Sequence, residues 1–445
     1  MAKTITRDLT SGSPMRLILG FLLPMLFGLL FQQFYNMVDA VVVGKFVGTK
    51  ALAAVGSVST LHTLMTGFLN GLTLGFSLIT AMCFGADNMK RLKKSFAMTM
   101  ELGVMTTTVL VVALMLVLQP LLHLLNVPEE QFAMSYAYIS VLIVGLFATV
   151  LYNLCANTLR AIGDSLTPLL FLILATVSNI GLDYLFILAF HMGVQGAAYA
   201  TVLAQLISVV LCFIRIFRKF PVLHLQKSDF RPEKELIVEM YKSGLSMGLM
   251  SCLVSIGTIM LQSAINTFGT TVIVAHTAAR KVFEIMSLPM SVLGSAMATY
   301  CGQNYGAKRF DRIRQGIRAS LLIAAIWSVA VFIICHTVEG ALIRFVASTT
   351  DAEVIYWGSM YLKVDMSFIV VCGVIVILRN SMQGFGDRVI PVFSSCIELA
   401  GKIIFAFVFA PMFAYWGIIW AEPVVWIAMV IPLIVKVVHT LKKEI

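Results

Sequence analysis

Two acidic residues stand inside long apolar segments of this 445-residue chain, where lipid or packed protein would surround them. Asp39 lies in the stretch QQFYNMVDAVVVGKF, and Asp183 lies in SNIGLDYLF. An acid at membrane depth costs about 2.5–3.5 kcal/mol on insertion scales, so each needs either a partner or a function. No Lys or Arg lies within two turns of Asp183 on its own segment, and Lys45 is nearly two turns from Asp39.

Two neutral polar residues fall close to these acids. Asn179 lies one turn from Asp183 on the same helix face. With a rise of about 1.5 Å per residue, Asp39, Asp183 and Thr201 all come at a depth of roughly 8–12 Å below the outer boundary. Such oxygen ligands suit Na⁺, and two neighbouring carboxylates can share a proton. We therefore predict a cation site for H⁺ or Na⁺. The alternative is that hydrogen bonds between helices hold the acids for structural reasons.

The elements that must position these residues are membrane helices. The chain is 59% hydrophobic and 12% charged, with a mean hydropathy of +0.94, whereas soluble domains carry about 25% charged residues. Its apolar runs mostly exceed the ~18 residues that indicate a spanning helix. We predict an all-α polytopic membrane protein with helices over residues 15–45, 51–82, 96–121, 132–156, 167–190, 194–217, 237–265, 273–302, 317–338, 355–381, 391–412 and 417–438.

The connections between these helices alternate in charge. One set, together with the two termini, holds most of the 32 Lys and Arg residues, and the other set is short and poor in them, apart from Lys45 and Lys50 in the first turn. Because positive charge marks the cytoplasmic side, both termini are expected inside, with the chain in the plasma (inner) membrane. The net charge of +10 then reflects topology and contact with anionic lipid, and no nucleic acid is expected as a partner.

The sequence also contains an internal repeat. GDSLTP at 163–168 returns as GDRVIP at 386–391, and FGADNMKRL at 84–92 returns as YGAKRFDRI at 305–313. Six helices separate the copies, which predicts two six-helix lobes related as a parallel repeat. We place an N-lobe at 1–217, a cytoplasmic linker at 218–236 and a C-lobe at 237–445.

The two acids are not repeated. By the same offsets Asp39 corresponds to Met260, and Asp183 corresponds to Ala406. A carboxylate that the fold requires should tend to recur in both lobes, so this asymmetry favours a functional role in the N-lobe.

Several stretches together resemble the multidrug and toxic compound extrusion (MATE) family. They are VDAVVVGKFVGTKALAAVG, LRAIGDSLTP, GLDYLF and MGVQGAAYATVLAQ, and they occur in the expected order. The resemblance implies a secondary active transporter that exports organic cations or similar amphiphiles in exchange for H⁺ or Na⁺, without a further cofactor. It assigns the cation site to Asp39, Asn179, Asp183 and Thr201, and it adds a Tyr of the fourth helix, for which Tyr138 is favoured over Tyr136.

A substrate cavity is expected from both lobes. One branch of the family uses an acid within the seventh helix, where this chain has only Gln262 and Asn266, so a second cation site of that type is not expected. Glu398 and Lys402, four residues apart, are expected to pair, and so are Arg280 and Glu284. Glu422 has no local partner. The cavity candidates are Gln33, Asn36, Gln262, Asn266, Glu284, Asp365 and Glu422.

Other functions leave weaker signals. GFGD at 384–387 matches the short GxGD motif of intramembrane proteases, but its counterpart AIGD at 161–164 indicates a repeated helix-end turn. A lipid-linked saccharide flippase would need Arg residues in its cavity, whereas Arg here falls mainly at the inner boundary. No GxxxxGK[ST] motif supports ATP hydrolysis, and the eight scattered Cys predict neither a zinc site nor a disulfide framework. The chain is therefore expected to be a transporter rather than an enzyme, working as a monomer, and Pro24 is a candidate hinge.

Overall fold

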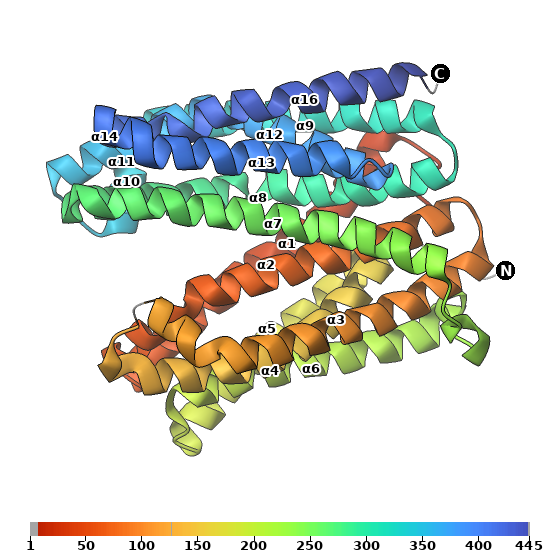
Figure 1. Cartoon of the computed structure of the whole chain (residues 1–445), viewed down its shortest axis with the longest axis horizontal. Coiled ribbons are helices and arrows are strands. Elements are labelled where there is room, and N and C mark those ends of the chain that lie inside the picture. The colour runs from red at the N-terminus through yellow and green to blue at the C-terminus, as the bar shows by residue number, and fades with distance from the viewer. Residues whose placement is uncertain (1–7, 126, 444–445) are drawn as a thin grey trace. The chain divides into compact units, whose positions relative to one another are not determined.

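A computed structural model of the chain describes residues 8–125 and 127–443, and its regular structure within those ranges is helical. The chain divides into two compact units (Figure 1). The first contains Leu23–Gly248, and the second contains Leu9–Leu22 together with the residues from Leu249 onward. This architecture confirms the predicted all-α class with two repeated halves.

The first unit is a bundle of long helices in which α2 packs against α4 and α4 packs against α6. Gly145 on α4 allows the closest approach to α6, because a Cβ there would lie 2.2 Å from Val202 Cγ2. The elements are α1 (Pro14–Phe46, from Leu23 on), α2 (Thr49–Gly85), α3 (Met89–Leu124), α4 (Glu129–Ala161), α5 (Leu166–Tyr184), the π-helical turn η1 (Leu185–Ala189), α6 (Gly193–Lys219), the short 3-10 helices η2 (Pro221–Leu223) and η3 (Lys227–Phe230), and α7 (Lys234–Ile265, up to Gly248).

The second unit repeats this arrangement, with α8 packed against α11 and α12. Its elements are the rest of α7, the 3-10 turn η4 (Asn266–Phe268), α8 (Thr270–Gly306), α9 (Phe310–Thr337), α10 (Glu339–Ala347), α11 (Ala352–Ser367), α12 (Ile369–Gly384), α13 (Val389–Ile404), the π-helical turn η5 (Phe405–Phe409), α14 (Ala410–Phe413), α15 (Tyr415–Ile419) and α16 (Ala421–Lys443).

The helix count agrees with the expected twelve spans. Among the described residues, 11 helices are long and apolar enough to cross a membrane, or 12 if one bent pair forms a single span. That pair is α11 and α12, which replace the straight helix expected at 355–381 and meet at a 50° bend. The Ser367 hydroxyl donates to the Lys363 carbonyl at 2.8 Å just before the break, a side-chain bond that tends to bend helices. The short helix α10 was not expected.

The two compact units divide the chain at other residues than the expected lobes in two places. The start of α1, Leu9–Leu22, belongs to the second unit, and the first part of α7 belongs to the first unit. The segment expected as a linker at 218–236 is not free either, because Phe220, Leu223 and Leu236 are buried in the core of the first unit. Hydropathy finds where helices begin, but it does not show which bundle buries them.

The repeated sequence stretches form the same backbone turns. Asp87 and Lys308 both take a left-handed conformation, with φ of 54° and 56°. Gly163 and Gly386 both have φ of 90°, in a region that favours glycine. The turn that contains GFGD is therefore the copy of the turn that contains AIGD, as the repeat predicted.

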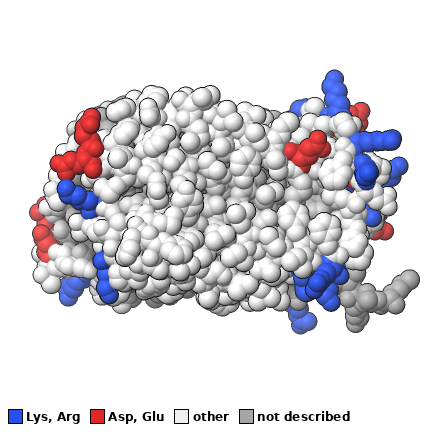
Figure 2. All heavy atoms as spheres, turned by 90° about the horizontal axis from the view of Figure 1, so that it is seen from below, with Lys and Arg blue, Asp and Glu red and all other residues white. Residues whose placement is uncertain are grey.

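Charged side chains gather toward the helix ends. On the face seen in Figure 2, Lys and Arg crowd one end and a smaller mixed group lies at the other, while the surface between them shows no charged residues. This distribution fits helices that cross a membrane. The chain termini themselves lie outside the described residues.

Candidate cation site

Helix α5 carries Asn179 and Asp183 one turn apart on its buried face, where they are 1% and 0% exposed. In the amide orientation that satisfies both neighbours, Asn179 Nδ2 donates to Asp183 Oδ2 at 3.1 Å. Its Oδ1 accepts from the backbone N–H of Thr201 on α6 at 3.2 Å. Asn179 therefore ties the acid of α5 to the neighbouring helix.

A second chain of hydrogen bonds reaches the same point from α1. The Tyr35 hydroxyl donates to Thr201 Oγ1 at 3.3 Å, and Thr201 Oγ1 donates to the Ala197 carbonyl at 3.0 Å. Tyr35 was not among the predicted site residues. The available signal was its position four residues before Asp39, which places both on one face of α1.

The carboxyl groups of Asp39 and Asp183 lie close enough to form a hydrogen bond with each other. Two carboxyl groups can do so only when one of them carries a proton, because an ionised carboxylate has no donor. Oδ1 of each residue is buried and makes no hydrogen bond in the described part of the chain. The pair therefore has oxygen atoms to spare for a small cation.

Tyr138 completes the group from α4. It is 8% exposed and lies within electrostatic range of Asp39, Tyr35 and Asp183. The structure thus brings together all five predicted cation-site residues, which come from α1, α4, α5 and α6 of the first unit. Within the described residues, no ion pair joins either acid to a Lys or Arg. The cluster offers carboxyl, amide and hydroxyl oxygens without a built-in counter-charge.

The remaining polar candidates of α1 differ from this group in their exposure. Gln33 and Asn36 are both exposed. Their predicted contact with substrate stays a prediction.

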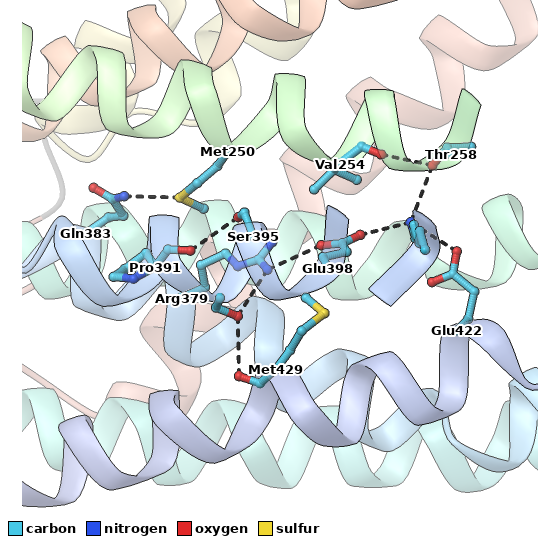
Figure 3. A network of polar contacts seen from close by, with 12 residues as sticks. Met250, Val254, Thr258, Arg379, Gln383, Pro391, Ser395, Glu398, Glu422 and Met429 are labelled. Carbon is cyan, nitrogen blue, oxygen red and sulfur yellow. Dashed lines mark hydrogen bonds and ion pairs between the residues drawn. The ribbon is translucent and has the colours of Figure 1, made fainter. Parts of the chain in front are cut away.

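Glu398 and Glu422 of the second unit have a different environment, because each is paired with cations. Lys402 Nζ on α13 lies 3.0 Å from Glu398 Oε1 and 3.2 Å from Glu422 Oε1 (Figure 3). Arg379 Nη2 on α12 lies 3.4 Å from Glu398 Oε2 and 3.3 Å from the Ser394 hydroxyl. The expected pair of Glu398 and Lys402 is confirmed as part of a larger buried network.

Glu422 on α16 is held by this network instead of facing open space. Arg280 Nη1 donates to Glu422 Oε1 at 3.3 Å, and Arg280 Nε lies 3.7 Å from Glu284 Oε1. Glu422 is 5% exposed and pairs with cations of other helices, while its predicted place in a substrate cavity stays a prediction. Its partners were hidden in the sequence because they lie 20 and 142 residues away. Arg379, which was expected at an inner turn, is also buried. Glutamates neutralise the charges of both Arg379 and Arg280.

The other three candidates of the second unit lie in separate places. Gln262 Nε2 donates to Asn266 Oδ1 at 2.9 Å near the end of α7. Asp365 is fully buried in the last turn of α11, next to the Tyr361 hydroxyl and within electrostatic range of Glu422. Glu284 is exposed beside Arg280, where the expected pair is confirmed. A role in substrate binding remains a prediction for each of them.

Comparison with known proteins places the chain among transporters. The MatE family model matches residues 24–185 and 246–408, once in each repeat. The probable multidrug resistance protein YoeA of Bacillus subtilis (strain 168) is 27% identical over 408 residues, covering 89% of this chain and 87% of that protein. The multidrug export protein MepA of Staphylococcus aureus (strain MSSA476) is 20% identical over 408 residues, covering 91% and 89%.

Solved structures share the fold. A crystal structure of MATE in the bent conformation superposes with a TM-score of 0.90 at 22% identity, covering 98% of both chains. The outward-facing conformation of a multidrug resistance MATE family transporter superposes with a TM-score of 0.88 at 22% identity, covering 100% of both chains.

Proposed function

The chain belongs to the MatE family, and from this premise we propose that it is a secondary active antiporter that exports small organic cations or similar amphiphiles in exchange for H⁺ or Na⁺. The names of its relatives, a probable multidrug resistance protein and a multidrug export protein, support the outward transport of varied small molecules. The observation that carries the coupling is the pair of carboxyl groups of Asp39 and Asp183, in which Asp183 is buried, Asp39 is half-buried with a buried Oδ1, and neither has a cationic partner in the described residues.

The site residues would divide the work by their chemistry. Asp39 and Asp183 hold the proton or ligate Na⁺, and binding of either ion removes net negative charge from the site. Asn179 fixes Asp183, while the Tyr35 and Thr201 hydroxyls fix the side of the site formed by α1 and α6. An ion drives transport only if it and the substrate prefer different conformations. We place the protein in the plasma membrane as a monomer, with both termini in the cytoplasm and no cofactor beyond the coupling ion.

Transport in energised vesicles tests this proposal. Purified protein is reconstituted, a pH or Na⁺ gradient is imposed, and movement of a fluorescent lipophilic cation is followed. We expect Asp39→Asn and Asp183→Asn each to lower gradient-driven transport at least tenfold, which corresponds to about 1.4 kcal/mol. Asp87→Asn is the matched control, because Asp87 is exposed and its left-handed backbone suits Asn. Wild-type transport by both site variants would overturn the proposal.

A further inference from the structure

In the second unit, side chains at the turn between α8 and α9 hold the short segment before α1 by hydrogen bonds. We call these contacts the clasp of α1. The backbone N–H of Leu9 donates to Gln303 Oε1 at 3.0 Å. The Leu9 carbonyl accepts from Asn304 Nδ2 at 3.2 Å and from Arg312 Nη2 at 3.3 Å. The Gly12 carbonyl accepts from Arg312 Nη1 at 3.0 Å. Leu9 is 1% exposed, so this segment is buried and hydrogen-bonded although it has no regular structure.

Other hydrogen bonds within the second unit also hold Arg312 in position. Its Nε donates to Asn304 Oδ1 at 3.1 Å, and its own carbonyl accepts from the Tyr300 hydroxyl at 3.1 Å. The planar guanidinium thus aims its remaining donors at two backbone carbonyls in fixed directions, a geometry that Lys cannot reproduce. Gly12 has a φ of +88°, a conformation that favours glycine.

The repeat places an equivalent arginine in the first unit. Arg91 occupies the position of Arg312 in the stretch FGADNMKRL, and it follows the same left-handed turn. Arg91 Nη2 donates to Glu239 Oε2 at 2.8 Å, and Lys94 Nζ lies 2.5 Å from Glu233 Oε2. These two acids belong to the beginning of α7 and the residue before it. In each repeat, side chains therefore hold the start of the long helix that continues into the other unit. We call the contacts of Arg91 and Lys94 with these two acids the clasp of α7.

We propose that Arg312 and Arg91 are positioning residues that make α1 and α7 the mechanical links between the two units. Arg312 fixes the first turns of α1 in the second unit, whereas Asp39 lies on the same helix in the first unit, roughly 24 Å along the axis from Leu23. Movement between the units would then pull on the helix that carries the cation site. This inference rests on the proposed antiport, because it explains how a change in Asp39 is transmitted.

The two clasps differ in their physical chemistry. The clasp of α1 is buried and uses backbone carbonyls, so salt should affect it little. The clasp of α7 uses ion pairs that are partly exposed, and salt screens such pairs. The Lys94 ammonium, hydrogen-bonded to Glu233, lowers the pKa of that carboxyl. The contribution of the Lys94–Glu233 pair to stability is therefore present above the usual pKa of Glu, and it is lost as the pH falls through the lowered pKa of Glu233.

Hydrogen–deuterium exchange of the purified full chain tests the clasp without relying on transport. We expect Arg312→Ala to speed amide exchange over residues 14–22 about tenfold, because the segment before the helix loses two of the hydrogen bonds to its carbonyls. Arg312→Lys should recover only part of the protection. Arg318→Ala is the matched control on the same helix, since Arg318 is exposed. Raised salt should speed exchange at the start of α7 but leave residues 14–22 unchanged. Wild-type exchange over residues 14–22 in both Arg312 variants would overturn the proposal.

Transport separates a coupling role from a merely structural one. In Arg312→Lys, which keeps the charge and the fold more readily than Ala, gradient-driven transport should fall about fivefold while the affinity for the lipophilic cation stays within about twofold of the wild type. Transport at the wild-type rate in this variant, alongside loss of transport in Asp39→Asn, would overturn the link and leave the antiport standing. If transport by the wild-type protein responds to neither the pH gradient nor the Na⁺ gradient, the proposed antiport is wrong. The hydrogen–deuterium exchange measurement still tests the clasp of α1 in that case.

Discussion

At the residue scale, the Asp39 and Asp183 pair of the first unit and the Glu398 and Glu422 pair of the second are stabilised in opposite ways. Asp39 and Asp183 lie close to each other, and Asp183 accepts a hydrogen bond from the neutral amide of Asn179. Glu398 and Glu422 instead share Lys402, and each has an arginine as a second partner. A carboxylate that is already paired with a cation binds a further small cation less favourably, because the existing ion pair must first be broken. This difference favours the Asp39 and Asp183 pair over the Glu398 and Glu422 pair as the cation site.

Removing one acid from the buried network should be costly. Glu422→Gln leaves Lys402 with a single carboxylate and Arg280 with only the exposed Glu284. Breaking a buried pair from one side destabilises a protein by about 3–5 kcal/mol. We therefore expect a clear fall in the melting temperature of the detergent-solubilised protein. Glu284→Gln, as the exposed control, should change it little, by about 0.5 kcal/mol or less. Equal melting temperatures for the two variants would contradict the pairing.

At the element scale, glycines determine how closely helices approach in the first unit. A Cβ on Gly71 of α2 would lie 2.5 Å from the Met247 carbonyl oxygen of α7, and one on Gly75 would lie 2.6 Å from Gly244 Cα. Helices in a membrane associate through such small residues because they allow backbone contact. The contact also explains why the first part of α7 belongs to the first unit, a placement that the charge pattern of the connections did not predict.

Adding one methyl group tests this helix contact. Gly75→Ala should destabilise the protein by about 1–3 kcal/mol, because backbone atoms of α7 cannot move aside as a flexible side chain would. Gly56→Ala on the same helix is the control, since nothing lies within 4 Å of the added Cβ. That variant should be neutral or slightly stabilised. Thermal unfolding monitored by fluorescence would measure both, and a stable Gly75→Ala protein would show that the contact is looser than described.

At the scale of the whole molecule, α1 passes from the second unit into the first between Leu22 and Leu23, and Pro24 lies directly after this boundary. Proline has no N–H to donate to the carbonyl one turn earlier, so the helix is easiest to bend there. The hinge predicted from the sequence therefore lies where a link between the two units would need to bend.

Replacing this proline should impair coupling more than folding. We expect Pro24→Ala to lower gradient-driven transport several-fold, because a continuous α1 resists bending, while the amount of folded protein in the membrane stays similar. Pro120→Ala is a suitable comparison, since Pro120 also lies inside a helix, α3, of the first unit. Coupled transport at the wild-type rate in Pro24→Ala would rule out the hinge.

Much of this protein could be predicted from local sequence. Runs of apolar residues define the helices, and repeated turns such as those at Asp87 and Lys308 reveal the two halves. Asn179 and Asp183 were recognisable as neighbours because four residues make one helical turn. These features depend on residues close in sequence, where hydropathy and helix geometry are sufficient.

Tertiary structure alone decided the pairing across helices. It placed Tyr35 against Thr201 and gave Glu422 its partners Arg280 and Lys402. It also assigned the start of α1 to the second unit and the start of α7 to the first, whereas the rest of each helix belongs to the other unit. The reason is that such contacts depend on how each helix is rotated and where it bends, as α11 and α12 do. Side-chain packing sets these variables, and a pattern of apolar and polar residues along one helix does not specify them.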